Sequence, residues 1–343
     1  MNPGIGISGM GRIGRLLIRK LMLGKTSDLK AINSMHPIET IAHLLKYDSI
    51  HGTWEADIRV EGDVLLINDH AIQVVYERDP SRIPWKKLGV DIVMDATGKF
   101  NNREGAKLHQ IGGAETVIIT APGENMDLTI VMGVNDEKYD PKEHKLLSAA
   151  SCTTNCLAPV LHILDQAYGV QRGWMTTIHS FTSDQRHLDN PHKDLRRARG
   201  CTQSIVPTTT GVGKALKDVL PHLAGCMEGS SIRVPTQDVS LIDLTLQVSH
   251  DTNTADVRAK LREAAKGRSS AYVDYTEEPL VSIDFIGNDK SAVIDGLTVS
   301  ASDRFIKLMA WYDNEWGYAS RVIDLANLVQ ERMSEACMIP LNK

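Results

Sequence analysis

The chain has 343 residues, 42% of them hydrophobic and 24% charged, which excludes a disordered or low-complexity protein and predicts two domains. Its 38 basic and 43 acidic residues give a formal net charge of −5, which argues against a dedicated nucleic-acid-binding protein. No apolar run approaches the roughly 18 residues that a transmembrane helix needs, and the first residues lack the pattern of a secretory signal.

Short apolar strands alternate with amphipathic helices through the first 150 residues. This alternation predicts a parallel sheet with right-handed crossover connections. Between residues 55 and 77 the pattern changes to β-rich loops, with a hairpin at Asn68-Asp69. The expected strands cover residues 4–9, 29–33, 90–96, 116–120, 129–133 and 146–149, and the expected helices cover residues 12–24, 37–48 and 103–111.

The pattern of the sequence changes after Ser151. A polar, basic stretch over residues 182–203 has little periodicity, and the β-rich segments beyond it are widely spaced, which predicts a mixed or antiparallel sheet. The expected helices cover residues 155–168, 255–266 and 319–336, and the expected strands cover residues 173–179, 231–234, 239–248 and 280–284. We predict one domain over residues 1–151, with the C-terminal segment 319–343 packed back on it, and an α+β domain over residues 152–318.

The first expected strand runs directly into the motif Gly9-x-Gly11-x-x-Gly14, which opens the first expected helix. Glycines at this turn allow the backbone to approach a pyrophosphate, and the helix N-terminus supplies unpaired N–H groups. A tight turn without a ligand is the alternative, but the position between first strand and first helix favours a nucleotide. The motif therefore predicts a Rossmann-type parallel-sheet domain that binds a dinucleotide.

The residues after the second expected strand bear on which dinucleotide binds. An NAD site usually places a carboxylate there to bind the adenosine ribose, whereas this chain has Asn33-Ser34 and its nearest acid is Glu39. Without that carboxylate nothing repels a 2′-phosphate. The sequence therefore predicts that NADP is accepted and favoured, although Asn33 alone could bind the ribose of NAD.

Cys152 lies where a helix is expected to begin, in the segment Ser151-Cys152-Thr153-Thr154-Asn155-Cys156. A helix N-terminus lowers the pKa of a thiol, and the thiolate is the form that attacks a carbonyl. Cys156 lies one turn later and is either structural or a resolving thiol. The spacing of these two cysteines is wrong for zinc, so no metal site is expected. Buried apolar roles are expected for Cys201, Cys226 and Cys337, and the sparse cysteines indicate reduced thiols in a cytoplasmic protein.

A general base and anion-binding groups are also needed. His179 is the best of the 12 histidines because it ends an apolar strand, whereas we expect ordinary structural roles for His36, His70, His144 and His222. Arg233 and the hydroxyl-rich turn 208–211 follow the basic run 192–199, and together they predict a small phosphorylated substrate. The alternative for the basic run is a solvated face.

Several strings in this chain resemble those of phosphorylating glyceraldehyde-3-phosphate dehydrogenases, and they occur in the order of that family. The resemblance covers nearly the whole chain, and the second and last strings are highly specific. It implies a Rossmann domain, a catalytic α+β domain and a homotetramer. The strings are Gly9-x-Gly-x-x-Gly14, Ser151-Cys-Thr-Thr-Asn-Cys156, Pro191-His-Lys-Asp-Leu-Arg-Arg-Ala-Arg199, Pro207-Thr-Thr-Thr-Gly211, Arg233-Val-Pro-Thr236 and Trp311-Tyr-Asp-Asn-Glu-Trp-Gly317.

The resemblance also implies roles for individual residues. Cys152 is the nucleophile and His179 the base, and Thr182 and Arg233 hold the phosphate of the substrate. The thiolate is flanked by Ser151 and Thr153, and inorganic phosphate is held by Arg197, Thr210 and Gly211. Besides the glycines, Asn33 and Ser34, the expected cofactor residues are Arg12, Ile13, Arg78, Thr97, Gly98, Thr120, Asn314 and Tyr318.

The chain departs from the usual family pattern at four places. Ser8-Gly9-Met10-Gly11 replaces Asn-Gly-Phe-Gly, Ser34 replaces the acid, Asn190-Pro191 replaces Leu-Pro, and Gln237-Asp238 replaces Pro-Asn. The second and third departures lie where family members control access of the 2′-phosphate. In these respects the chain is similar to the NADP-accepting, gluconeogenic bacterial branch.

Two rival functions remain open from the sequence. An erythrose-4-phosphate dehydrogenase is a sister activity on the same scaffold, but that branch tends to lose the turn that is intact here as Thr209-Thr210-Gly211. A non-enzymatic RNA-binding protein would use the basic run, but an intact Cys152 and His179 argue against it. The expected partners are therefore a small phosphorylated aldehyde and inorganic phosphate, without membrane or dedicated nucleic-acid binding.

Overall fold

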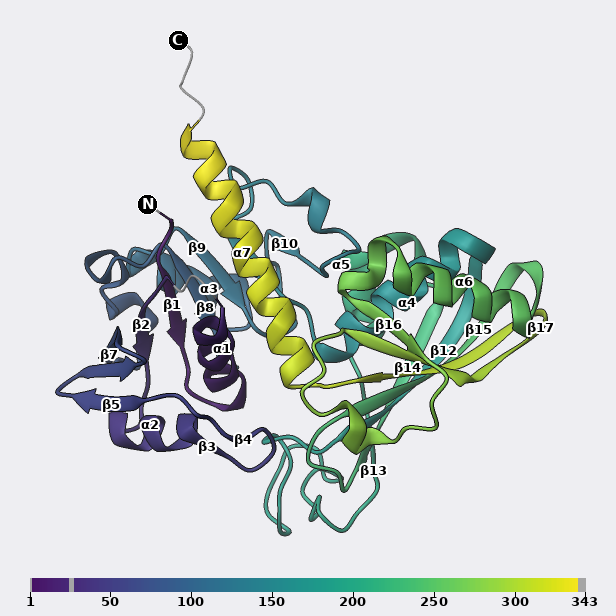
Figure 1. Cartoon of the computed structure of the whole chain (residues 1–343), viewed down its shortest axis with the longest axis horizontal. Helices are drawn as coiled ribbons and strands as arrows, with labels where there is room; N and C mark the ends of the chain where they lie inside the picture. Colours follow the sequence, from purple (N-terminus) through teal and green to yellow (C-terminus); the bar gives the residue numbers. More distant parts are fainter. Residues whose placement is uncertain (1, 25–27, 339–343) are drawn as a thin grey trace. The chain divides into compact units, whose positions relative to one another are not determined.

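A computed structural model of the chain describes residues 2–24 and 28–338 (Figure 1). It divides into two compact units. The first consists of the described residues of segments 1–130 and 135–151 together with those from 319 onward, and the second of residues 131–134 and 152–318. Residues 339–343 of the expected C-terminal segment lie outside the described part of the chain.

The first unit is built on a nine-stranded sheet in the order β10-β11-β9-β8-β1-β2-β7-β6-β5. Its central strands are parallel, and three of them are buried along their whole length, as expected where helices cover both faces. The Rossmann-type α/β prediction is confirmed. The strands are β1 (Ile5–Ser8), β2 (Leu29–Asn33), β5 (Ile58–Glu61), β6 (Val64–Ile67), β7 (His70–Val75), β8 (Ile92–Asp95), β9 (Thr116–Ile119), β10 (Leu128–Thr129) and β11 (Leu146–Ser148).

Helices and short turns complete the first unit. Gln330 of α7 donates a hydrogen bond to the Pro3 carbonyl at 2.7 Å, which ties the last helix to the start of the chain. The β3–β4 pair is a separate ribbon (Tyr47–Asp48 and Gly52–Thr53). The helices are α1 (Arg12–Leu23), α2 (Ile38–Lys46), α3 (Arg103–Ile111) and α7 (Trp316–Met338), of which residues 316–318 belong to the second unit, and the 3-10 turns are η1 (Pro80–Arg82), η2 (Trp85–Leu88) and η3 (Asp136–Lys138).

Two expectations for the first unit have different outcomes. The hairpin is confirmed, because Asn68 and Asp69 have φ values of 47° and 66° and form the two-residue turn between β6 and β7. The strand expected over residues 129–133 is wrong, because β10 ends at Thr129. The Thr129 carbonyl accepts a hydrogen bond from the Asn135 side chain at 2.9 Å, and Gly133 turns the chain with a φ of 79°.

The second unit is built on a six-stranded sheet in the order β13-β14-β12-β15-β17-β16. Parallel pairs (β12 with β14, β16 with β17) and antiparallel pairs (β12 with β15, β15 with β17) confirm the mixed sheet. The strands are β12 (Val170–Ser180), β13 (Val206–Thr208), β14 (Met227–Val234), β15 (Ser240–Asn253), β16 (Val273–Thr276) and β17 (Ala292–Tyr312), and the helices are α4 (Cys152–Tyr168), α5 (Val212–Val219), α6 (Thr254–Lys266), η4 (Pro221–Leu223), η5 (Arg268–Ala271) and η6 (Ser282–Phe285).

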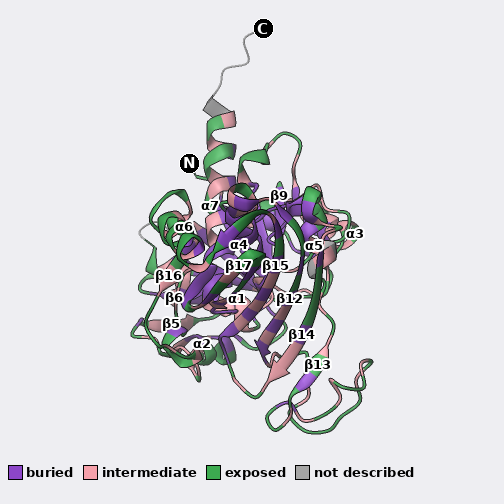
Figure 2. Cartoon of the chain, turned by 90° about the vertical axis from the view of Figure 1, so that its right-hand side faces the viewer, coloured by how far each residue is buried: buried purple, intermediate pink, exposed green. Residues whose placement is uncertain are grey.

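Helix α4 is the central helix of the second unit. Most of its side chains are buried, and Figure 2 shows it largely in the colour of buried residues, whereas strand β14, between β13 and β12, is exposed or half-buried at most of its residues. It begins at Cys152, three residues earlier than expected.

The prediction of a strand over residues 280–284 is wrong. That segment enters the 3-10 helix η6, whose start is fixed by the Val281 N–H donating to the Asp284 carboxylate at 2.8 Å.

Candidate active site

A cavity of about 460 Å³ opens in the first unit, at the carboxyl ends of β1, β2 and β8. This is the edge at which doubly wound sheets bind nucleotides. The predicted cofactor residues that line it are Gly9, Gly11, Asn33, Ser34, Arg78 and Thr97.

The glycine turn at this cavity fits a dinucleotide. A Cβ added to Gly11 would meet no atom within 4 Å, so the backbone lies open there, and the first turn of α1 has no side-chain cap. A Cβ on Gly14 would come within 1.9 Å of the Gly9 carbonyl oxygen, which shows how closely helix and turn pack. The residues present therefore fit a pyrophosphate on the N-terminus of α1.

Other predicted cofactor residues do not line this cavity. Arg12 instead forms an ion pair with Asp48 at 2.6 Å, and the Thr120 hydroxyl donates to the Asp95 carbonyl at 3.1 Å. Burial would raise the pKa of Asp48, but hydrogen bonds from the His51 and Ile50 N–H groups and from Arg12 outweigh it and lower the pKa to about 2. The cavity lining also lacks Ile13, Gly14 and Gly98. The last two predicted cofactor residues, Asn314 and Tyr318, belong to the second unit.

Sequence reasoning missed much of the lining. His36, expected to have an ordinary role, lines the cavity, and its N–H donates to the Ser34 hydroxyl at 3.0 Å. The signal that could have found these residues is their position, because most follow the end of a strand. The missed lining residues are Ser8, Met10, Arg15, Met35, His36, Thr40, Ile41, Leu44, Glu77, Pro80, Ala96, Lys99 and Phe100.

The second unit brings Cys152 and His179 together. Cys152 is the first residue of α4, His179 lies near the end of β12, and the thiol sulfur is 3.5 Å from Nε2 of the imidazole. The preceding Ala150 has a φ of 55°, an unfavourable value for a residue with a side chain, at the sharp entry to the helix. This pairing has the geometry of an activated nucleophile.

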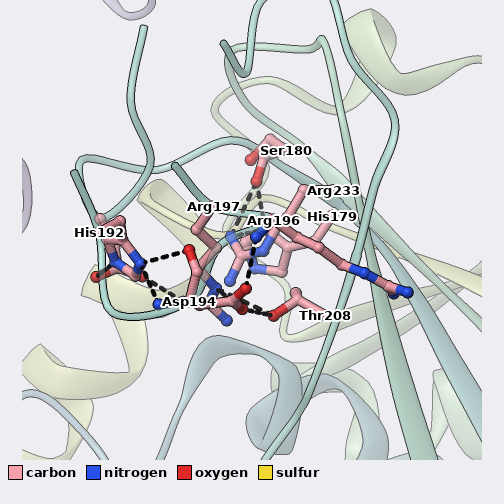
Figure 3. Close-up of polar contacts among 9 residues, drawn as sticks. His179, Ser180, His192, Asp194, Arg196, Arg197, Thr208 and Arg233 are labelled. Atoms are coloured by element: carbon pink, nitrogen blue, oxygen red, sulfur yellow. Dashed lines mark hydrogen bonds and ion pairs between the residues drawn. The ribbon is translucent and has the colours of Figure 1, made fainter. Parts of the chain in front are cut away.

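The Ser180 carbonyl, which also accepts from Arg233, fixes the orientation of the imidazole (Figure 3). Its Nη1 lies 3.0 Å from both the Ser180 carbonyl oxygen and Nδ1 of His179, and that Nδ1 is 2.8 Å from the same carbonyl. Arg233 has only donors, so the carbonyl is the common acceptor, and we assign the proton of His179 to Nδ1. The lone pair on Nε2 then faces the thiol, as a general base requires.

Burial shifts the pKa values of both side chains in this pair. It raises the pKa of the Cys152 thiol, an effect only partly opposed by the Arg233 charge and the Thr153 hydrogen bonds. The expected lowering of this thiol pKa at the helix N-terminus is therefore wrong, because desolvation outweighs it. Burial and the Arg233 charge also lower the pKa of His179 to about 3. Burial therefore disfavours the charged form of both groups.

Arg197 lies in the long loop between β12 and β13 and is held by acidic partners (Figure 3). It forms an ion pair with Asp184, lies 3.5 Å from Asp194, and donates to the Thr208 hydroxyl at 3.1 Å. Its charge also contributes to the lowered pKa of His179. Of the other predicted phosphate groups, Thr182 and Thr210 are half-buried and Gly211 is exposed.

Two further residues near this pair are held by hydroxyl groups. The Asn314 carbonyl oxygen accepts hydrogen bonds from Ser180 at 2.9 Å and Ser240 at 2.7 Å, which turns the amide nitrogen away from both serines. Tyr312, whose ring lies edge-on to His179, shares hydrogen bonds with Thr153 at 3.0 Å and Thr177 at 2.8 Å. Sequence reasoning missed Ser180, Ser240 and Tyr312 as supports of the site.

Within the described residues, no helix is both long enough and apolar enough to cross a membrane.

The chain is 49% identical over 334 residues to glyceraldehyde-3-phosphate dehydrogenase 2 of Bacillus subtilis, covering 97% of this chain and 98% of the relative. It is 48% identical over 329 residues to glyceraldehyde-3-phosphate dehydrogenase of Geobacillus stearothermophilus, covering 96% and 98%.

Two family models match the two halves of the chain. The NAD binding domain of glyceraldehyde 3-phosphate dehydrogenase matches residues 4–103, which include the cavity residues, and the C-terminal domain matches residues 151–314, which include Cys152 and His179. Together with the identities over nearly the whole length, these matches show that the chain belongs to the glyceraldehyde-3-phosphate dehydrogenase family of oxidoreductases.

Proposed function

We propose that this enzyme oxidises and phosphorylates glyceraldehyde 3-phosphate through a thioester on Cys152, with His179 as acid and base. The observation that carries the proposal is the 3.5 Å approach of the Cys152 sulfur to Nε2 of His179, beside two guanidinium groups. A thiol and an imidazole in contact supply a nucleophile and its base, and the guanidinium groups supply binding for phosphate.

The first half of the reaction forms and oxidises a hemithioacetal. His179 Nε2 takes the thiol proton, the sulfur bonds to the aldehyde carbon, and the resulting alkoxide takes that proton back. The backbone N–H of Cys152, at the start of α4, is placed to stabilise this oxyanion. His179 then removes the hydroxyl proton while the C–H electron pair leaves as hydride, and a bound nicotinamide would supply the acceptor for it.

The second half releases the product. An oxygen of inorganic phosphate attacks the thioester carbon, the carbon–sulfur bond breaks, and the acyl phosphate leaves the regenerated thiolate. Arg233 and Thr182 would hold the phosphate of the aldehyde. Arg197, Thr210 and Gly211 would hold inorganic phosphate, with Arg197 exchanging its carboxylate partners for the anion. The thiolate would lie between Ser151 and Thr153.

The proposal includes acceptance of NADP, as in the NADP-accepting gluconeogenic branch. Ser34 lines the cavity where an NAD site usually has an acid, and its hydroxyl accepts from the His36 N–H, so its own proton is available to a phosphate oxygen. Arg78 and His36 add donors at the same cavity. Glu77 also lines it, but its carboxylate lies 3.5 Å from Arg82. These groups favour a 2′-phosphate more than the sequence alone indicated.

The proposal also includes a homotetramer and a cytoplasmic location. Trp174 on β12 and Phe305 on β17 are 58% and 57% exposed, and the register through β15 places both on one face of the second sheet. Two large exposed aromatic side chains on one sheet face favour association with another subunit. The four described cysteines are free thiols, as expected in a reducing compartment.

One set of initial rates tests the proposed activity and cofactor. NAD and NADP are each combined with glyceraldehyde 3-phosphate or erythrose 4-phosphate, with and without inorganic phosphate. We expect phosphate-dependent reduction of both cofactors with the triose, and kcat/KM for NADP at least comparable to that for NAD. Strict NAD use would refute the cofactor proposal, and a preference for the tetrose would favour the erythrose-4-phosphate activity.

A further inference from the structure

Three buried side chains in the first unit form a hydrogen-bonded chain that the proposed chemistry does not use. The Trp85 indole donates to Nδ1 of His109 at 3.1 Å, and Nε2 of His109 lies 3.0 Å from the Asp95 carboxylate. Trp85 belongs to η2, His109 to α3 and Asp95 to the end of β8. The exposed fractions are 0% for Trp85, 0% for His109 and 2% for Asp95.

The chemistry of the three side chains fixes which group donates and which accepts in each hydrogen bond. An indole nitrogen can only donate, so Nδ1 of His109 must accept, and the single proton of the neutral ring lies on Nε2. That proton is donated to Asp95. A protonated imidazole would place two donors against each other at Trp85, so the geometry requires the neutral ring.

The hydrogen-bonded series of side chains ends at the backbone that lines the dinucleotide cavity. The other carboxylate oxygen of Asp95 accepts the Thr97 N–H at 2.7 Å, and Thr97 in turn accepts the Lys99 N–H at 3.1 Å through its hydroxyl. Ala96, Thr97 and Lys99 all line the cavity. The orientation of the Asp95 carboxylate therefore sets the turn that forms one wall of the cavity.

We propose that His109 is a positioning residue for dinucleotide binding, acting through Asp95 on the turn 96–99. Trp85 holds the ring in the tautomer that donates to Asp95, and the carboxylate holds the turn. Without this donor, the buried carboxylate would rotate or draw in water, and the turn would lose its fixed conformation. The inference rests on the cavity being the dinucleotide site of the proposed function.

Two substitutions at one position separate positioning from packing. His109→Leu removes both hydrogen bonds, whereas His109→Gln keeps an acceptor for Trp85 and a donor for Asp95. We expect His109→Leu to raise the dissociation constant for NAD and NADP about tenfold, and His109→Gln to raise it less than about threefold. Equilibrium dialysis measures both without turnover. If His109→Leu does not fold, His109→Asn, too short to span both partners, takes its place.

Kinetics and a matched histidine complete the test. The KM for the dinucleotide should rise with the dissociation constant, while those for aldehyde and inorganic phosphate stay within about twofold. His70→Leu removes a histidine bonded at 2.8 Å to the Leu29 carbonyl, away from the cavity lining, and should leave dinucleotide binding unchanged. Unchanged binding in His109→Leu, or His109→Gln binding as weakly as His109→Leu, would overturn the inference. Failure of the wild-type chain to bind any dinucleotide would instead refute the proposed function.

Discussion

The first turns of α1 and α4 make two helix N-terminal sites by opposite means. At α1 the chain removes side chains, because Gly11 leaves open space and no side chain caps the helix. At α4 it places a reactive side chain, Cys152, as the first helical residue and buries its neighbours. A site made of backbone groups is therefore encoded locally, whereas the site at Cys152 needs His179 and Arg233 from distant strands.

Cys152→Ser should cause the largest loss of activity, because it removes the proposed nucleophile. The hydroxyl is far less nucleophilic than a thiolate, so turnover should fall on the order of 10⁴-fold or more while dinucleotide binding at the α1 site persists. Initial rates and equilibrium dialysis measure the two effects. Cys226→Ser, at another half-buried cysteine of the same unit, is the control and should keep activity. Iodoacetamide should label Cys152 first, and preferential labelling elsewhere with parallel loss of activity would contradict the assignment.

His179→Asn tests the base of the same site. General acid–base catalysis typically contributes about 10²–10⁴ in rate, and turnover should fall by that range. The alkylation rate of Cys152 at neutral pH should fall as well, because burial raises the pKa of the thiol and leaves it dependent on a neighbouring proton acceptor. Unchanged alkylation together with unchanged turnover would remove His179 from the mechanism.

Arg233→Gln tests the anion-binding part of the site at Cys152. Loss of a charge-assisted hydrogen bond to phosphate should raise the KM for the aldehyde about tenfold or more, with little change in the KM for the dinucleotide. Arg172→Gln, at an exposed arginine of β12, should leave both constants unchanged. Arg197→Gln should instead affect the KM for inorganic phosphate. Wild-type dependence on aldehyde and phosphate in both variants would contradict these roles.

Ser34→Asp tests the cofactor preference of the cavity in the first unit. A carboxylate beside Arg78 and His36 would repel a 2′-phosphate and bind the free ribose hydroxyls. The ratio of kcat/KM values should shift toward NAD by about tenfold, or about 1.4 kcal/mol. His36→Ala, which keeps the backbone N–H to Ser34, should lower kcat/KM for NADP more than that for NAD. An unchanged NADP/NAD ratio in Ser34→Asp would show that this position does not discriminate.

Asp238→Asn is expected to change stability and not turnover. Burial, with the charges of Asp313 and Glu315, raises the pKa of Asp238 to about 9, so the folded chain keeps a proton that the unfolded chain releases near pH 4. The unfolding free energy of the wild type therefore contains a contribution that is present at acidic pH and is lost as pH rises from about 4 to 9.

The amide of Asp238→Asn carries no such proton. The variant should be more stable than the wild type at pH 8 by on the order of 2 kcal/mol, and the difference should vanish near pH 4. Urea unfolding at several pH values measures this. Asp243→Asn, at an aspartate half-exposed on β15, is the control. A difference that is constant with pH would contradict the protonated Asp238.

Local features of the sequence were sufficient for the parts of the molecule that depend on neighbours along the chain. Gly9, Gly11 and Gly14 identified the nucleotide turn because strand, turn and helix are consecutive. Periodicity found α3 at its observed bounds, and the segment around Cys152 indicated the residue that we propose as the nucleophile. The segments 129–133 and 280–284 were misassigned, because a side-chain hydrogen bond from Asn135 and the turn at Asp284 override strand-like composition.

Distant groups that share a site are brought together by the fold, which the local sequence does not show. The fold paired Arg12 with Asp48, brought His36 to the wall of the cavity, and linked Trp85 through His109 to Asp95. It also reversed the expected pKa of Cys152, because desolvation depends on every group packed around the sulfur. The amino-acid sequence alone shows which chemical groups the chain carries and which local turns present them. Burial and long-range contacts determined their charges, their partners and their orientation.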